Sequence, residues 1–222
     1  TGPIVDMLFE DGERLQRAVQ GGMKFNFRYS SKISRDFLLA RGRIPDHVWE
    51  PQTTRAVIAL SKGRKAVLIG GAYIGDHALY AAKALATGGA VHCFELSSDS
   101  IEMLRANLAD NHITNVIVNQ EALWSVDGVK IQLRGHDSHA SPELVDGKAE
   151  GEAFNSRSID RYAVEKKLDR LDLVMLDIEG GEYNAIQGAA SVLSRPGKDA
   201  PAVICEIHSA YIDWSNGLRS TP

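Results

Sequence analysis

Residues 66–96 constrain the fold of this chain more than any other stretch. An apolar run at 66–69 leads into a glycine-rich turn at 70–75, and an alanine-rich amphipathic segment follows at 77–86. A second apolar run at 90–94 then ends at an acidic residue. A crossover helix of this length returns the chain in its original direction, so the pattern predicts two parallel strands joined by a helix.

The glycines and the acid indicate a ligand that contains a nucleoside. Glycine lets the backbone approach a ligand closely and leaves the amides at the start of the next helix accessible. Glu95, at the end of the second predicted strand, can accept hydrogen bonds from both hydroxyls of a ribose. The dinucleotide fingerprint G-x-G-x-x-G fails, because counting from Gly71 it requires glycines where Tyr73 and Asp76 stand. A nicotinamide dehydrogenase is therefore disfavoured, although the turn alone also fits an ordinary strand–helix connection.

The rest of the chain continues this alternation of strands and helices. Strand-like apolar runs occur at 115–119, 129–133, 171–176 and 202–207, and helical patterns occur at 97–111, 158–168 and 185–193. The alternation predicts an α/β fold with a doubly wound, mostly parallel sheet and helices on both faces. The run at 129–133 predicts an antiparallel strand, and the polar segment 134–156 is expected to be a long loop.

Polar residues and glycines gather where the predicted strands end. They are the turn at 71–75, Glu95, Glu121 with Ala122, Asp177 and His208. In open parallel sheets, ligands bind at the carboxyl ends of the strands, near the point where the strand order reverses. The sequence therefore predicts one binding site along this edge of the sheet.

Residues 1–60 carry weaker signals. Helical spacing is found at 4–20, 36–41 and 51–60. Residues 23–34 mix aromatic and basic side chains, which predicts either a packed connector or a lid over a substrate pocket. We expect an N-terminal helical or lid segment at 1–50 and the main ligand-binding domain at 51–222.

Charge and composition limit the classes of partner. Lysine and arginine number 25 against 29 acidic residues, and no basic run stands out, so nucleic acid is not favoured as a partner. No apolar run approaches the ~20 residues that span a bilayer, and no secretory signal is evident, so we expect a cytoplasmic protein without membrane contact. Cys93 and Cys205 lie in apolar runs and are expected to be buried, reduced thiols. The expected partner is a small-molecule substrate, and a homo-oligomer is left open.

Four motifs resemble one known family. The segments GAYIG, FEL, LDLVMLDIEGGEYNAIQGA and AVICEIH are similar to those of the FkbM family of S-adenosylmethionine-dependent methyltransferases, over about residues 48–210. The D-x-E-G-x-E motif within them is the most specific. The resemblance implies a class I methyltransferase fold, Rossmann-like, with strand order 3-2-1-4-5. It also implies methylation of a hydroxyl on a small molecule or sugar, with S-adenosylhomocysteine as product.

The resemblance also implies which residues contact S-adenosylmethionine. They are Gly71, Ala72, Tyr73, Gly75, Glu95, Leu96, Glu121, Ala122 and Asp177. The glycine turn would cradle the methionine end of the cofactor. Glu95 would bind the ribose hydroxyls, and Glu121 with Ala122 would border the adenine.

The expected catalytic residues follow the last two predicted strands. Methyl transfer to a hydroxyl requires a group that takes its proton, and Asp177 and His208 are the candidates, with His77 a weaker one. Asp177 would also face the amino-acid part of the cofactor or the substrate. Glu179 and Glu182 would shape the substrate side of the site.

No metal is assigned from the sequence. Asp177, Glu179 and Glu182 offer oxygen ligands of the kind that Mg²⁺ prefers, but nothing in their spacing fixes three of them around one ion. Acidic Glu206 is expected either to be a buried acid paired with a cation or to contact the substrate. The group His136, Asp137 and His139 is interpreted as a solvated loop rather than a zinc site.

The chain departs from the family pattern at four positions. Ile69 replaces an acid, Tyr73 an asparagine, Leu96 a proline and Met175 a lysine. Loss of the acid removes an expected partner for the ammonium group of the cofactor. These changes support an alternative function, a catalytically degenerate module of the same fold that binds S-adenosylmethionine or a partner. The few residues after His208 also predict either a truncated chain or a sheet without its usual C-terminal hairpin.

Overall fold

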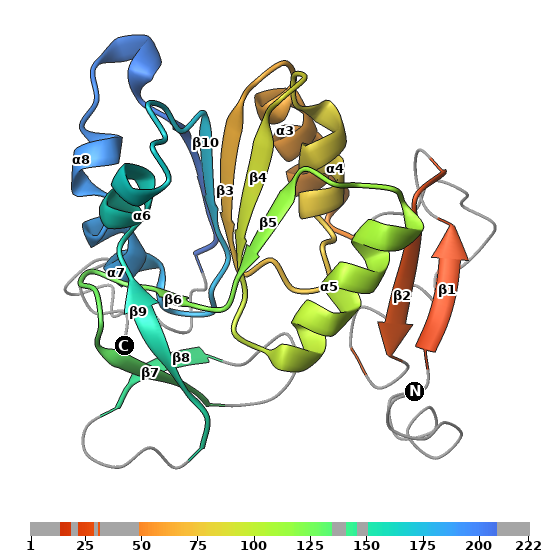
Figure 1. Cartoon of the computed structure of the whole chain (residues 1–222), viewed down its shortest axis with the longest axis horizontal. Coiled ribbons are helices and arrows are strands. Elements are labelled where there is room, and N and C mark those ends of the chain that lie inside the picture. The colour runs from red at the N-terminus through yellow and green to blue at the C-terminus, as the bar shows by residue number, and fades with distance from the viewer. Residues whose placement is uncertain are drawn as a thin grey trace.

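A sheet of five parallel strands forms the centre of the protein (Figure 1). The computed structural model describes residues 14–18, 22–28, 31, 49–134, 141–145 and 151–207. The central strands are β3 (Ala66–Gly70), β4 (Ala90–Phe94), β5 (Val116–Asn119), β10 (Leu173–Leu176) and β11 (Ala202–Cys205). Their order is β11-β10-β3-β4-β5, and every neighbouring pair is parallel. The predicted doubly wound α/β fold is confirmed.

Helices cover both faces of this sheet (Figure 1). One face carries α3 (Pro51–Ser61), α4 (Ala78–Ala84) and α5 (Ser98–Asp110), and the other carries α6 (Ile159–Glu165), α7 (Glu182–Gln187) and α8 (Ala190–Leu193). Strand β3 supplies both cores, because Val67 and Ile69 join the first hydrophobic cluster whereas Ala66 and Leu68 join the second. A strand buried on both faces must be apolar at every position, which explains the uninterrupted run at 66–69.

The strand order reverses beside β3. From β3 the chain proceeds to β4 and β5 on one side, and it later returns to β10 and β11 on the other. The carboxyl ends of all five strands meet at one edge of the sheet. A crevice for a ligand is expected at such a reversal, between β3 and β10.

A second, smaller sheet lies by this carboxyl edge (Figure 1). Its strands are β6 (Ala122–Leu123), β7 (Lys130–Arg134), β8 (Ser141–Leu144) and β9 (Ala153–Arg157), in the order β6-β9-β7-β8. The antiparallel strand predicted at 129–133 is confirmed, but it belongs to this sheet. The prediction of a loop at 134–156 is wrong at β8 and β9. Buried Ile131 and Phe154 pack with Trp124 in a third hydrophobic cluster, which provides the stabilisation that the local pattern does not reveal.

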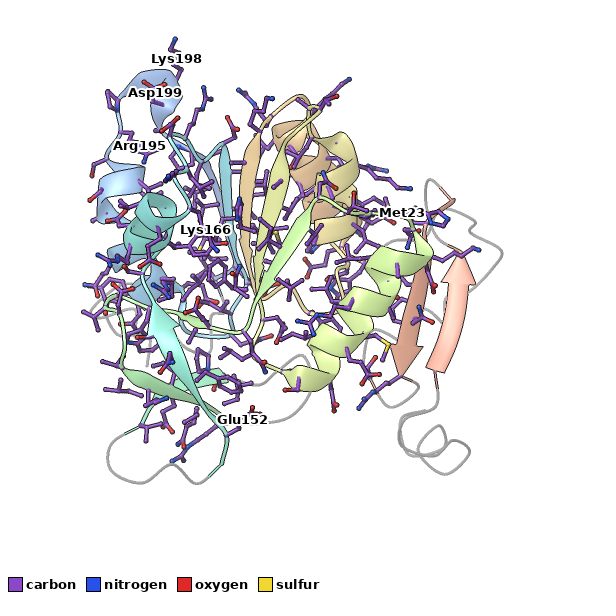
Figure 2. All side chains as sticks on the ribbon, viewed as in Figure 1. Met23, Glu152, Lys166, Arg195, Lys198 and Asp199 are labelled. Carbon is purple, nitrogen blue, oxygen red and sulfur yellow. The ribbon has the colours of Figure 1, made fainter. Side chains whose placement is uncertain are left out.

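Strands β1 (Arg14–Ala18) and β2 (Lys24–Arg28) form an antiparallel hairpin beside α5 (Figure 1). The helix predicted at 4–20 is therefore wrong at β1, and the irregular connector predicted at 23–34 is wrong at β2. Phe25 and Phe27 are buried in the first hydrophobic cluster, so the extended conformation of β2 is determined by packing against the helices. Met23 lies where the hairpin meets α5 (Figure 2). The helix predicted at 36–41 lies outside the described residues, and the boundary at residue 50 stays a prediction.

Helix ends follow the local sequence signals in most places. Pro51 opens α3, and the Ser97 hydroxyl accepts a hydrogen bond from Ser100 N at the start of α5. The single helix predicted at 185–193 is instead two short helices around Gly188. A Cβ atom at Gly188 would lie 2.1 Å from the Trp124 carbonyl oxygen, so only glycine allows this approach. No helix in the described part of the chain is long and apolar enough to cross a membrane.

Candidate active site at the carboxyl edge of the sheet

The glycine turn is held between the ends of β4 and β10. The amides of Gly71 and Ala72 both donate to the Phe94 carbonyl, with N···O distances of 2.9 and 3.1 Å. Gly71 has a φ of 74°, and a Cβ atom there would lie 1.7 Å from the Asp177 carbonyl oxygen. Glycine is therefore required at Gly71 by both its backbone conformation and the closeness of β10.

Glu95 ties this turn to the start of α5. Its carboxylate accepts hydrogen bonds from the amides of Tyr73, Leu96 and Ser97, each at 2.8 Å. Burial raises the pKa of Glu95 above its ordinary value, although the three amides oppose the shift. The side chain is therefore fixed in place and retains acceptor capacity, since a carboxylate offers about four lone-pair sites.

Tyr73 adopts a backbone conformation that tyrosine rarely takes. Its φ is 41°, in the left-handed region where asparagine and glycine are far more common. The family pattern has asparagine at this position. The hydrogen bond from Tyr73 N to Glu95 helps to hold the strained turn in place.

On the predicted adenine side, the Glu121 carboxylate pairs with a residue that the sequence did not single out. Arg157, at the end of β9, donates to Glu121 through Nη2 at 2.8 Å and Nε at 3.2 Å. Because of this bond, the pKa of Arg157 is raised. Ala122 is buried in β6, directly after Glu121. No local signal identifies Arg157, because its pairing depends on β6 lying beside β9.

Glu182 of the D-x-E-G-x-E motif faces its own loop. One carboxylate oxygen accepts from Ile178 N at 2.8 Å, and the other accepts from Gly180 N at 2.9 Å. Burial raises the pKa of Glu182, and these amides oppose the shift. Gly181 lies in close contact with Pro142 of β8, so the second sheet packs against this loop.

Three acids meet where β10 and β11 end. Carboxylate oxygens of Asp177, Glu179 and Glu206 all lie within 4.8 Å of one another. Burial and then the neighbouring Glu206 raise the pKa of Asp177 to about 9, so Asp177 carries a proton at neutral pH. Glu206 thus takes the place beside Asp177 and Glu179 that the sequence analysis gave to Glu182. It is exposed, so the expectation of a buried acid at this position is wrong.

His77 is buried at the start of α4. Its Nδ1 is 3.2 Å from Thr54 Oγ1, and its Nε2 has no hydrogen-bond partner. Nε2 is 3.7 Å from a carboxylate oxygen of Glu50 and 3.8 Å from one of Asp76. Asp76 was missed because a turn residue has no periodicity. Its charge contributes to the raised pKa values of both Glu95 and Asp177.

Other predicted residues lie outside the described part of the chain. They are the candidate base His208 and the loop residues His136, Asp137 and His139. Their predicted roles therefore stay predictions.

Several solved structures that are similar to this chain are methyltransferases with low sequence identity. The O-methyltransferase TomG of Streptomyces achromogenes, solved with S-adenosylmethionine, is 18% identical over 77% of this chain and 60% of its own, with a TM-score of 0.44. A Bacillus cereus O-methyltransferase, solved with S-adenosylhomocysteine, is 17% identical over 75% and 62%, with a TM-score of 0.45. The tRNA (uracil-54, C5)-methyltransferase of Pyrococcus abyssi is 20% identical over 48% and 24%, with a TM-score of 0.34.

The chain spans less than two thirds of each of these three structures. No curated protein sequence matches it. One family model does, the methyltransferase FkbM domain, over residues 70–217. This match covers more than half of the chain and contains the glycine turn, Glu95 and the D-x-E-G-x-E motif. The chain therefore belongs to the FkbM family of S-adenosylmethionine-dependent methyltransferases.

Proposed function

We propose that the protein transfers the methyl group of S-adenosylmethionine to a hydroxyl oxygen of a small molecule or sugar. The observation that carries this proposal is the link between the glycine turn and Glu95 at the reversal of the strand order. It places a preoriented carboxylate next to a turn whose backbone can approach a ligand. Family membership supports methyl transfer, and the choice of a hydroxyl acceptor rests on the family resemblance.

The residues at this edge fit the chemical groups of the cofactor. Glu95 would accept hydrogen bonds from the ribose hydroxyls while it keeps its three amide donors. Gly71, Ala72 and Gly75 would lie along the methionine end, with Tyr73 and Leu96 beside the ribose. When bound, S-adenosylmethionine supplies a methyl group on a sulfonium that is open to attack.

Adenine would lie against the backbone of Glu121 and Ala122. The Glu121 side chain is already paired with Arg157, so we assign its carboxylate to holding β6 against β9. The backbone of this segment is then the part that remains to recognise the base.

Asp177 and Glu206 would serve the attacking hydroxyl. Asp177 keeps its proton at neutral pH and shares it with Glu206 in a hydrogen bond, so Asp177 would position the Glu206 carboxylate toward the hydroxyl. The Glu206 carboxylate can accept the proton that the hydroxyl loses. His208 remains a second proposed proton acceptor. Glu179 would contact the substrate, and Glu182 would hold the loop that positions Glu179.

Substitution of Glu95 tests the cofactor site. Glu95→Gln keeps the shape of the side chain but removes the charge that favours two ribose hydroxyl donors. We expect it to weaken binding of S-adenosylhomocysteine by about 10–100-fold in a calorimetric titration, as for a lost charge-assisted hydrogen bond. Glu95→Ala is a poorer choice, because it also removes the acceptor of three backbone amides.

Asp169→Asn is the matched control, since Asp169 is exposed and its carbonyl accepts from Arg195, near the amino edge of the sheet (Figure 2). Unchanged binding by a folded Glu95→Gln variant would contradict the site. The reaction itself is tested by incubating the protein with S-adenosylmethionine and a phenol or sugar, and by measuring the S-adenosylhomocysteine that forms. If the cofactor binds but no S-adenosylhomocysteine forms with any of these acceptors, the degenerate binding module would be favoured instead.

A further inference from the structure

The edge of the central sheet opposite the candidate active site carries an excess of positive charge. Three segments lie at this edge, each just before a strand: residues 62–65 precede β3, residues 167–172 precede β10 and residues 195–199 precede β11. Together these segments, the basic edge, contain seven lysines and arginines and three acids, whereas the whole chain has 25 and 29. The basic edge is therefore opposite in charge to the molecule as a whole.

Hydrogen bonds join the three segments into one surface. Strand β10 lies between β3 and β11, so the segment before β10 is the central one. The Asp172 carboxylate accepts from Lys65 N at 2.9 Å, and the Asp169 carbonyl accepts from Arg195 Nη1 at 2.7 Å. Figure 2 shows Arg195 and Lys198 on the side of the molecule where the central strands begin. Because the fold assembles these cations from distant segments, no basic run marks them in the sequence.

Most of the positive charge at the basic edge faces the solvent. Four of its cations are exposed and have no ion-pair partner among the described residues: Lys62, Arg64, Lys167 and Lys198. One of the three acids is used within the protein, since the Asp172 side chain is 6% exposed and its carboxylate lies 2.8 Å from Arg170 Nε. The two remaining acids do not balance the four unpaired cations, so this surface attracts an anionic partner.

The make-up of the basic edge indicates which anionic partner it fits. Three of the four unpaired cations are lysines, which are strongly hydrated point charges and are depleted in protein–protein interfaces. None of the three segments contains an aromatic residue on which a nucleic-acid base could stack. A layer of anionic lipid headgroups requires neither paired geometry nor stacking, but only several cations within a Debye length of about 8 Å from the surface.

The two ends of the strands differ in charge, which favours one orientation near such a layer. Glu179 and Glu206 lie where β10 and β11 end, whereas the basic edge lies where the same strands begin. In the field of an anionic surface, this separation turns the basic edge toward the surface and the acids away from it. The candidate active site then faces the solvent, where a substrate can reach it.

We propose that the basic edge binds the surface of an anionic membrane. The contact is peripheral and electrostatic, and it is made by the four unpaired cations. It differs from the expectation of a protein without membrane contact, which rested on the lengths of apolar runs and on the absence of a secretory signal. Binding at this edge is independent of the proposed function, because it involves no residue of the candidate active site.

Flotation of the purified protein with lipid vesicles tests the proposal. We expect binding to phosphatidylcholine vesicles that contain about 30% phosphatidylserine, and none to pure phosphatidylcholine vesicles. Binding should disappear at about 0.5 M salt, because salt screens the charges. The double variant Lys62→Gln with Lys198→Gln should bind about 10–50-fold more weakly, since each basic residue near an anionic surface contributes a factor of about five.

Lys130→Gln with Arg55→Gln is the matched control. It removes the same charge at two exposed positions outside the basic edge, in β7 and α3, and should bind within about twofold of wild type. Circular dichroism shows whether each variant is folded. Equal binding to both kinds of vesicle, binding to neither, or an equal loss in both double variants would overturn the proposal. Binding of an RNA duplex but not of anionic vesicles would also overturn it, and would assign the basic edge to nucleic acid.

Discussion

At the residue scale, Asp177 makes the stability of the fold depend on pH. The folded chain holds the Asp177 proton up to a pKa of about 9, because of burial and the nearby Glu206, against an ordinary value of 3.8. The stabilisation from this proton is therefore complete below pH 3.8 and is lost as the pH rises toward 9. The charge created by deprotonation lies at a half-buried position with acids around it.

Asp177→Asn should remove this dependence, since an amide resembles a protonated carboxyl group. We expect the variant to be more stable than wild type at pH 8, by about 1–3 kcal/mol. For a chain of this size each kcal/mol raises Tm by roughly 2–4 °C. The advantage should shrink as the pH approaches 4, and thermal unfolding over this pH range measures it. Parallel Tm curves for variant and wild type would contradict the assigned pKa.

Residues of the site differ in how far the sequence reveals them. Glu95 could be predicted because an acid at the end of an apolar strand is visible in the local pattern. Asp76 and Arg157 could not, since Asp76 acts on Glu95 and Asp177 and Arg157 pairs with Glu121, all of them in distant segments. For Glu182 the motif marks the residue, but only the structure shows that its carboxylate binds amides of its own loop.

At the element scale, Gly188 controls how α7 and α8 pack against the second sheet. A Cβ atom at Gly188 would lie 2.1 Å from the Trp124 carbonyl oxygen and 3.2 Å from Ser158 Cβ. The Gly188 carbonyl also accepts from Asp160 N at the start of α6. A side chain at this position must therefore push apart backbone segments of two elements.

Gly188→Ala should destabilise the protein by about 2–4 kcal/mol through this overpacking. Gly151→Ala is the matched control, because a Cβ atom at Gly151 would meet nothing within 4 Å. Urea unfolding of both variants gives the two free energies of unfolding. An equal decrease in the free energy of unfolding for both variants would show that the close contact with the Trp124 carbonyl does not cause the destabilisation.

The two sheets differ in how well the local sequence predicts their strands. The five central strands were visible because a strand buried on both faces is an uninterrupted apolar run. In the second sheet only β7 was visible, because β6, β8 and β9 are short and β9 pairs with β7 and β6 over more than twenty residues. Its strands have two to five residues, so their stability comes from partners rather than from their own pattern.

At the scale of the whole molecule, the N-terminal hairpin is connected to the glycine turn through one side chain. Asn107 of α5 is fully buried, and its Oδ1 accepts from both N and Nδ2 of Asn26, at 2.6 and 2.9 Å. Its Nδ2 donates to the Ile74 carbonyl at 2.8 Å, within the glycine turn. Asn107 thus fixes the hairpin and the turn relative to each other.

Asn111, one helical turn later, binds the same hairpin without reaching the glycine turn. Its side chain accepts from Lys24 N at 2.8 Å and donates to Lys24 O at 2.6 Å, at an exposed position. Both asparagines therefore contact the hairpin, but only Asn107 also contacts the ligand-binding edge. They form a matched pair for mutagenesis.

Asn107→Ala should destabilise the fold by about 2–4 kcal/mol, because it leaves buried donors of Asn26 and the Ile74 carbonyl unsatisfied. Asn111→Ala should cost about 1 kcal/mol, since water can replace its exposed bonds. Both should speed hydrogen exchange in β2, but only Asn107→Ala should also weaken S-adenosylhomocysteine, by about tenfold, because the turn loses its anchor. Calorimetric titration well below each Tm compares them. Equal affinity in the two variants would mean that Glu95 and the neighbouring strands hold the turn without the hairpin.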